Sequence, residues 1–359
     1  MSKKRKKPYK GYFDIEHMVA ECEEKHIAFA IAVSEDKYRG AGKTFSAAKA
    51  LYKRYLERQE RFVLFVREVK ELGHCAEGIF GAYLAQNYPN VTIYEKKQDN
   101  IFSIIYIQTG TGKEKKTDVL GYVTPLKNAK NLKNYRGIWE TANVKKFYMD
   151  EFMPLDNKYL RINGLEETDL MKTIIDTVNG KVEDLVIIMT ANCISLGNPY
   201  FSMLGLNSKI QSNTRSIKTD TVIYEKVEVE GLDERHMMSS INRAFGKNTE
   251  EYASNVWIGD NNSLVCKPDN WGRPIYICAI VYNNQTYGVY SYPNVGLYYI
   301  STSWDSTYDY TYALTLDGDL NVPLLRGNKT ICRLRDWFYD GVVRVANGGI
   351  QRMLLDVFG

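Results

Sequence analysis

The chain has 359 residues, of which 44% are hydrophobic and 25% charged, the composition of an ordinary globular protein long enough for two domains. Its formal net charge is only +4, which excludes a protein that is basic throughout, as histones are. No apolar run is long enough to cross a bilayer, and the basic N-terminus lacks the apolar stretch of a signal peptide, so no membrane partner is expected.

Cysteine usage indicates a reducing compartment. The six cysteines are scattered, with no Cys-x-x-Cys pair and no metal-ligand spacing to the four histidines. This pattern predicts reduced, mostly buried thiols in a cytosolic protein.

The N-terminal part of the chain alternates predicted helices and strands. Residues 1–13 form a basic arm, and an amphipathic helix is predicted over 14–26. A buried strand over 27–33, a glycine-containing loop over 37–44 and a helix over 45–58 follow. Strand, glycine loop and helix in this order are the context that a phosphate-binding loop requires.

The glycine loop resembles a P-loop, because it contains Arg39-Gly40-Ala41-Gly42-Lys43-Thr44. Its backbone N–H groups would cradle phosphates, Lys43 would reach the β- and γ-phosphates, and Thr44 would bind Mg²⁺. The general pattern has a glycine six residues before the lysine, where this chain has Lys37. Taken alone, the loop fits an ordinary glycine turn equally well.

A second glycine-rich sequence at 110–113 is not read as a P-loop. A strand over 62–66 ending at Arg67 and a helix over 74–86 come first, and residues 91–123 then read as β. The sequence at 110–113 joins two strand candidates and lacks a Ser or Thr ligand for Mg²⁺. We therefore predict a hairpin turn there.

Acidic and amide side chains follow the next two predicted strands. A strand over 144–149 leads to Asp150 and Glu151, and a strand over 185–189 is followed by Asn192. In a P-loop enzyme, Asp150 would hold Mg²⁺ and Glu151 would polarise the attacking water, while Asn192 would bind the γ-phosphate or that water. The alternatives are a solvated strand end for the two acids and a turn cap for Asn192.

The alternation of helices and short apolar strands predicts an α/β fold with a mostly parallel sheet. Ligands of such sheets bind at the carboxyl ends of the strands. The P-loop, Arg67, Asp150, Glu151 and Asn192 all lie just past predicted strand ends, so we expect them to form one site.

Residues 127–140 form a basic stretch that we predict to be irregular. Four of its side chains could contact the phosphates of DNA, or could belong to an exposed loop that solvates the protein. These side chains are Lys127, Lys130, Lys133 and Arg136.

The second half of the chain divides into a linker and a C-terminal domain. Residues 206–253 are polar and read as a linker with a helix at about 233–245. Residues 254–359 read as a second domain that begins with closely spaced β runs and ends in helices from residue 331. The β runs are predicted at 275–281, 286–291 and 296–301.

Aspartates of the C-terminal domain could suggest a metal-dependent nuclease. A two-metal nuclease needs carboxylates that converge from several elements, and the predicted strand 275–281 carries none, so surface turns are favoured. The aspartates are Asp260, Asp305, Asp309, Asp317 and Asp319.

These motifs, in this order, resemble the DNA-encapsidation ATPases of small podoviruses, the motors that fill phage heads. The most telling segment runs from Thr190 to Phe201 and ends in Asn198-Pro199-Tyr200-Phe201. Shorter matches are Ile175-Asp176-Thr177-Val178, Ile280-Val281-Tyr282-Asn283 and the region 296–300.

The resemblance implies a P-loop ring-ATPase (ASCE-type) domain over 1–205 and an RNase H-like, vestigial nuclease domain over 254–359. It implies ATP and Mg²⁺ as cofactors and a ring, a homopentamer, at the portal (connector) of a prohead. The ring would drive double-stranded DNA inwards, in some relatives with a structural packaging RNA. Such a protein acts in the host cytoplasm at the portal vertex and is not expected in the mature virion.

The resemblance also bears on the arginines. The family's trans-acting arginine falls just before the sensor strand, where this chain has Lys181 instead, and Arg161 is a second candidate. A lysine lacks the planar fork that holds a γ-phosphate bidentately. Arg67 matches a family arginine at the end of the second strand.

Two other functions stay open. One is a terminase-type packaging protein with an active metal-dependent nuclease domain. The other is a non-motor protein that binds nucleic acid or the portal and has a vestigial P-loop, which the departure at Lys37 keeps possible.

Overall fold

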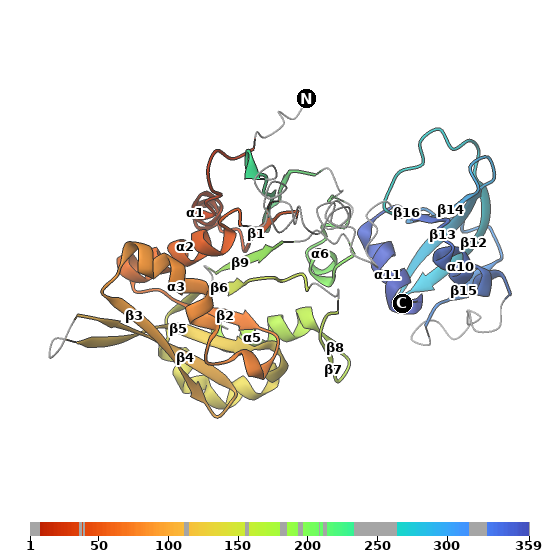
Figure 1. Ribbon diagram of the computed structural model, residues 1–359. Coiled ribbons are helices and arrows are strands. Elements are labelled where there is room, and N and C mark those ends of the chain that lie inside the picture. Colours follow the sequence, from red (N-terminus) through yellow and green to blue (C-terminus); the bar gives the residue numbers. More distant parts are fainter. Residues whose placement is uncertain are drawn as a thin grey trace, which may run out of the picture. The chain divides into compact units, whose positions relative to one another are not determined.

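A computed structural model gives the fold of this chain. It describes residues 8–35, 38, 40–110, 115–154, 158–179, 185–192, 197–207, 209–210, 214–232, 264–315 and 329–358. The chain forms two compact units (Figure 1). The first comprises residues 1–194 and 214–255, and the second comprises residues 195–213 and 256–359.

The first unit is built on a nine-stranded sheet with the order β10-β11-β1-β9-β6-β2-β5-β4-β3. Neighbouring strands from β11 to β5 pair in parallel, β10 pairs antiparallel with β11, and β3, β4 and β5 form an antiparallel meander. The strands are β1 (Phe29–Val33), β2 (Arg61–Val66), β3 (Val91–Gln98), β4 (Phe102–Thr109), β5 (Lys116–Pro125), β6 (Val144–Met149), β9 (Val186–Ala191), β10 (Ser216–Lys218) and β11 (Val222–Lys226).

Helices cover the large sheet because its central strands are apolar on both sides. On one face, α1 (Glu16–Lys25), α2 (Lys43–Arg58) and α3 (Cys75–Asn87) pack against the strands in a single core (Figure 1). Phe80 of α3, for example, stacks on Phe62 of β2 with ring centroids 5.2 Å apart. A short 3₁₀ helix, η2 (Val69–Glu71), links β2 to α3.

The basic stretch at 127–140 is helical, which corrects the prediction of an irregular segment. It comprises the 3₁₀ helix η4 (Leu126–Tyr135) and the short helix α4 (Arg136–Thr141). Apolar side chains spaced by three fit the three residues per turn of a 3₁₀ helix, and they are the buried ones, namely Leu126, Ala129 and Leu132.

Helix α5 (Glu167–Asn179) packs against η4 and α4 and contacts β6. It is preceded by a hairpin of β7 (Arg161–Ile162) and β8 (Leu165–Glu166). The residues between those strands, Asn163 and Gly164, both have positive φ, as a tight two-residue hairpin turn requires.

Part of the segment that the sequence analysis placed in the linker belongs to the sheet. Residues 216–226 contribute β10 and β11, and β11 pairs in parallel with β1. Polar residues precede this short strand in the sequence, but its own residues are buried, namely Val222, Ile223, Tyr224 and Glu225. The helix predicted at about 233–245 lies outside the described residues.

The second unit has a five-stranded sheet with the order β15-β12-β13-β14-β16. The three predicted β runs are confirmed as an antiparallel meander, and β15 and β16 pair in parallel at its two edges. The strands are β12 (Ile275–Tyr282), β13 (Gln285–Tyr292), β14 (Leu297–Ser301), β15 (Thr311–Ala313) and β16 (Val343–Val345).

Among its described residues, the second unit also contains the helices α6 (Pro199–Met203), α10 (Lys329–Tyr339) and α11 (Gly348–Phe358). The C-terminal stretch predicted as helices is therefore interrupted by β16. Asn198, which opens the Asn-Pro-Tyr-Phe segment, caps α6 by accepting a hydrogen bond from Phe201 N at 2.9 Å. The predicted fold class is confirmed as mixed α/β with a large, mostly parallel sheet. No helix in the described part of the chain has the length and apolarity that a bilayer span needs.

Candidate active site

The loop predicted to be a P-loop connects β1 to α2. Gly42 is the N-cap of α2 with φ 94°, and Gly40 has φ 81°, so both lie in the left-handed region that favours glycine. A Cβ added to Gly42 would lie 3.2 Å from the Cβ of Tyr12, which leaves little room for a side chain. Residues 37 and 39 are outside the described part of the chain. The loop thus leads into the N-terminus of a 16-residue helix, a site suited to phosphate.

The Lys43 ammonium reaches the ends of two neighbouring strands. Its Nζ donates to Ser34 Oγ at 2.5 Å and to Asn192 Oδ1 at 2.8 Å, and the residue is only 5% exposed. Ser34 follows β1 and Asn192 follows β9, and these strands are adjacent. Lys43 at the start of α2 and the amide of Asn192 beyond β9 therefore form one polar cluster.

Thr44 and Asp150 present oxygens to one another beside this cluster. Thr44 Oγ1 donates to Asp150 Oδ2 at 2.8 Å, and Thr190 Oγ1 donates to Asp150 Oδ1 at 2.5 Å. Carboxylate and hydroxyl oxygens are ligands that Mg²⁺ accepts, usually together with waters and substrate phosphates. The donor set at this position fits a magnesium ion.

Glu151 lies at the same edge of the sheet, and the structure shows a hydrogen bond for one of its two carboxylate oxygens. Its Oε1 accepts a hydrogen bond from the amide of Asn192. Its Oε2 is buried and has no hydrogen-bond partner within the described ranges. Burial, and secondarily the charge of Asp150, raises the pKa of the Glu151 carboxyl. A buried carboxylate oxygen without a protein partner is suited to hold a water molecule.

The strand order explains why these residues meet. β9 lies between β1, which precedes the glycine loop, and β6, which precedes Asp150 and Glu151. The carboxyl end of β9 therefore lies between Lys43 and Glu151, and Asn192 contacts both of these residues. Chain order alone does not place β9 there, because β6 precedes it in the sequence.

Arg67 contacts the main chain next to the acidic pair. Its guanidinium donates to the carbonyl oxygen of Glu151 at 2.9 Å and to that of Phe152 at 2.7 Å. It also forms an ion pair with Glu167, at 2.8 Å. These contacts indicate a role in holding the backbone beside the site.

The candidate trans-acting residues are not brought into this cluster where the structure describes them. Arg161 is exposed on β7, and its backbone lies opposite that of Glu166 in the β7–β8 hairpin. Lys181 and Arg39 lie outside the described residues.

The predicted DNA-binding side chains are exposed on η4 and at the start of α4. Two of them are in ion pairs, Lys127 with Glu68 at 3.2 Å and Arg136 with Glu140 at 3.4 Å. Lys130 and Lys133 are exposed on the same 3₁₀ helix. Lys133 and Arg136 also line a surface hollow of about 480 Å³ together with Thr173, Asp176 and Thr177.

Sequence reasoning missed three residues of the site. Ser34 is the first polar residue after the predicted strand 27–33, and Thr190 stands at the end of the strand before Asn192, so both carried a positional signal. Glu167 carried none, because it lies 100 residues from its partner Arg67.

The C-terminal aspartates that could suggest a nuclease are only partly described. Asp305 and Asp309 are exposed, and Asp305 accepts a hydrogen bond from Thr307 N at 2.9 Å, as in a surface turn. Asp260, Asp317 and Asp319 lie outside the described residues. Across the ranges that the structure covers, no three His, Cys, Asp or Glu side chains are grouped so that they could hold a metal.

Known proteins resemble this chain over nearly its whole length. The DNA packaging protein of Bacillus phage phi29 is 25% identical over 339 residues, which cover 89% of this chain and 91% of the relative. That of Bacillus phage B103 is 26% identical over 341 residues, covering 89% and 94%.

Solved structures share the fold. A chain of the bacteriophage phi29 viral genome packaging motor assembly superposes with a TM-score of 0.64 at 21% identity, covering 97% of this chain and 98% of that chain. A chain of the Phi-28 gp11 DNA packaging motor gives a TM-score of 0.58 at 15% identity, covering 97% and 96%. The sequence model of the podovirus DNA encapsidation proteins (Gp16) matches residues 12–359, and the chain therefore belongs to that family, as its motifs led us to expect.

Proposed function

We propose that this protein is an ATP-driven motor that moves double-stranded viral DNA into a preformed prohead. Membership of the DNA encapsidation family supports the packaging role. The observation that carries the ATPase assignment is the convergence of a P-loop with an acidic strand. Lys43 and Thr44, adjacent at the start of α2, bond to Asn192 and Asp150 at the ends of β9 and β6.

The geometry supports a separate role for each group of the site during phosphoryl transfer from ATP to water. The N-terminus of α2 and the P-loop N–H groups hold the phosphates, and Lys43 contacts the β- and γ-phosphate oxygens. Thr44 and Asp150 would hold Mg²⁺, which would supply positive charge against the charge that develops on those oxygens.

Glu151 supplies the base function. Its buried Oε2 orients a water for in-line attack on the γ-phosphate and accepts the proton of that water. Asn192 bonds both to the Glu151 carboxylate and to Lys43, so it is placed to respond to the presence of a γ-phosphate.

The assembly in which this site works is a further part of the proposal. The protein acts as a homopentameric ring at the portal of the prohead in the host cytoplasm, and a packaging RNA joins it in some systems. A residue of a neighbouring subunit, Arg161 or Lys181, completes the site and raises the rate of ATP hydrolysis about 10³-fold. Lys127, Lys130 and the other basic side chains of η4 and α4 contact DNA phosphates.

The proposal is tested by ATP turnover of the purified protein. We expect phosphate release that rises on addition of double-stranded DNA and proheads. A protein that binds DNA but shows no DNA-stimulated hydrolysis would instead fit a non-motor role with a vestigial P-loop. Nicking of a plasmid in the presence of Mn²⁺ would identify an active nuclease domain.

A further inference from the structure

The backbone of Glu151 adopts an unusual conformation. Its φ is 48°, in the left-handed region where side chains other than Gly, Asn and Asp are uncommon. Such a conformation costs free energy and persists only where surrounding contacts hold it. The residue that performs the proposed base function therefore depends on its neighbours for its backbone geometry.

Hydrogen bonds with three other residues fix this turn: Asp150 and Thr190 accept, and Arg67 donates. Glu151 N donates to Asp150 Oδ1 at 3.0 Å, and Phe152 N donates to Thr190 O at 3.1 Å. The two carbonyl oxygens of Glu151 and Phe152 accept from Arg67 Nη1 and Nη2. One guanidinium thus binds both carbonyl groups of the turn.

Glu167 in turn fixes that guanidinium. Its carboxylate accepts from Arg67 Nε at 3.1 Å and from Arg67 Nη2 at 2.8 Å, a bidentate arrangement with geometric specificity. It also accepts from Leu160 N at 2.8 Å. Glu167 is fully buried at the first position of α5, so its carboxylate has a fixed place in the fold.

We propose that Glu167 is a positioning residue for ATP hydrolysis. Through Arg67 it holds the backbone of Glu151 in the left-handed conformation that aims the carboxylate at the attacking water. Without the Glu167 carboxylate, the Arg67 guanidinium loses its bidentate partner and can turn towards the acidic pair itself. This inference rests on the proposed ATPase function and concerns the hydrolysis step, since Glu167 acts on Glu151 through Arg67.

The test compares Glu167→Gln with wild type in two assays. We expect kcat for ATP to fall about 100-fold, because a small misplacement of a catalytic group has an effect of that size. The dissociation constant for a non-hydrolysable ATP analogue should stay within about twofold of the wild-type value, because the substitution leaves the contacts that bind the nucleotide in its ground state unchanged. Glu167→Ala, which leaves no oxygen for Arg67 or Leu160, should lower kcat further than Glu167→Gln.

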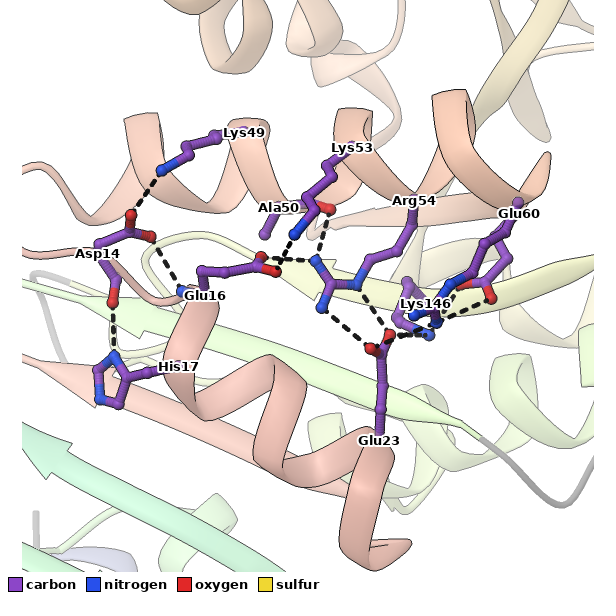
Figure 2. A network of polar contacts seen from close by, with 11 residues as sticks. Asp14, Glu16, His17, Glu23, Lys49, Ala50, Lys53, Arg54, Glu60 and Lys146 are labelled. Atoms are coloured by element: carbon purple, nitrogen blue, oxygen red, sulfur yellow. Dashed lines mark hydrogen bonds and ion pairs between the residues drawn. The ribbon is translucent and has the colours of Figure 1, made fainter.

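A matched control separates positioning from stability. Glu23 forms a comparable ion pair in the same unit, with Arg54 at 2.8 Å and Lys146 at 3.0 Å (Figure 2). Arg54 lies towards the C-terminal end of α2, whereas Lys43 begins that helix, and Lys146 lies in the first half of β6, whereas Asp150 follows its carboxyl end. Glu23→Gln should lower the melting temperature and leave kcat unchanged. Equal kcat values for the Glu167 and Glu23 variants, or a parallel loss of nucleotide affinity in Glu167→Gln, would overturn the proposal.

Arg67→Lys covers the case in which Glu167→Gln does not fold. A lysine keeps the charge facing Glu167, but it has three donors at a single point, whereas Arg67 makes four hydrogen bonds through a planar fork. The same selective loss of kcat is therefore expected. Unchanged kcat in this variant would equally refute the proposal. Failure of the ATPase assignment is distinguishable, because the wild-type protein itself would then release no phosphate from ATP above background.

Discussion

The ion-pair network between α1, α2 and β6 predicts a measurable sensitivity to acid. Glu23 binds Arg54 and Lys146, and both cationic side chains are only 4% exposed (Figure 2). Burial disfavours the ionised carboxylate, but its bonds to Arg54 and Lys146 outweigh burial and lower the pKa of Glu23 from 4.5 to about 2. Glu23 is therefore charged at neutral pH and stabilises the folded state through this network.

The size of the effect follows from the difference between the folded and unfolded pKa values. At 1.36 kcal/mol per pKa unit, the lowered pKa corresponds to about 3 kcal/mol of unfolding free energy at neutral pH. Because the folded pKa lies below the unfolded one, this contribution is present above the ordinary pKa and is lost as the pH falls from 4.5 towards 2.

Urea unfolding of wild type and Glu23→Gln at several pH values measures this contribution. We expect the variant to be less stable by about 2–3 kcal/mol at pH 7. The loss stays within the value derived from the pKa because Arg54 and Lys146 each keep a second carboxylate partner, Glu16 and Glu60. The difference should shrink below pH 4 and nearly vanish at about pH 2. Glu24→Gln, at an exposed neighbouring position of α1, is the control and should match wild type. A pH-independent difference between Glu23→Gln and wild type would refute this reasoning.

Three further predictions concern ligand binding. Gly42→Ala should weaken binding of a fluorescent ATP analogue, because a left-handed non-glycine residue costs about 1–2 kcal/mol and the new Cβ meets Tyr12; unchanged affinity would contradict the loop geometry. Lys43→Ala should raise the dissociation constant for ATP in a calorimetric titration, whereas a value equal to wild type would remove the P-loop assignment. Replacing Lys130 and Lys133 by Ala should lower DNA affinity and reduce the slope of log affinity against log salt by about two, one for each DNA phosphate that is no longer neutralised. An unchanged slope would place the DNA-binding surface elsewhere.

The sequence predicted the parts of the site that follow directly from strand ends. The strand over 144–149 is observed at those bounds, and Asp150 and Glu151 lie at its carboxyl end. Lys43 and Thr44 begin a helix after a glycine loop, as the P-loop pattern requires. These features are local, so residue order and apolar runs were sufficient to find them.

Other features depend on contacts between distant residues and could not be read in this way. The insertion of β9 between β1 and β6 decides that Asn192 touches both Lys43 and Glu151, and nothing in the order of the strands reveals it. The Arg67–Glu167 pair spans 100 residues. The short strand β11 was missed because it is only five residues long and polar residues precede it in the sequence.

The 3₁₀ helix η4 was within reach of sequence reasoning. Its buried residues recur every third position, a spacing that fits neither a strand nor an α-helix. Lysines and asparagines fill the positions between them and favoured the interpretation as an irregular loop. A search for the three-residue period would have found both the helix and its exposed basic side.

Single-turnover hydrolysis by Glu151→Gln tests the central claim most directly. The substitution keeps the size of the side chain and its contact with Asn192 but removes the base. We predict that the variant binds ATP and DNA as wild type does and releases no phosphate above background. Phosphate release at the wild-type rate would show that Glu151 is not the catalytic base and that hydrolysis takes place elsewhere.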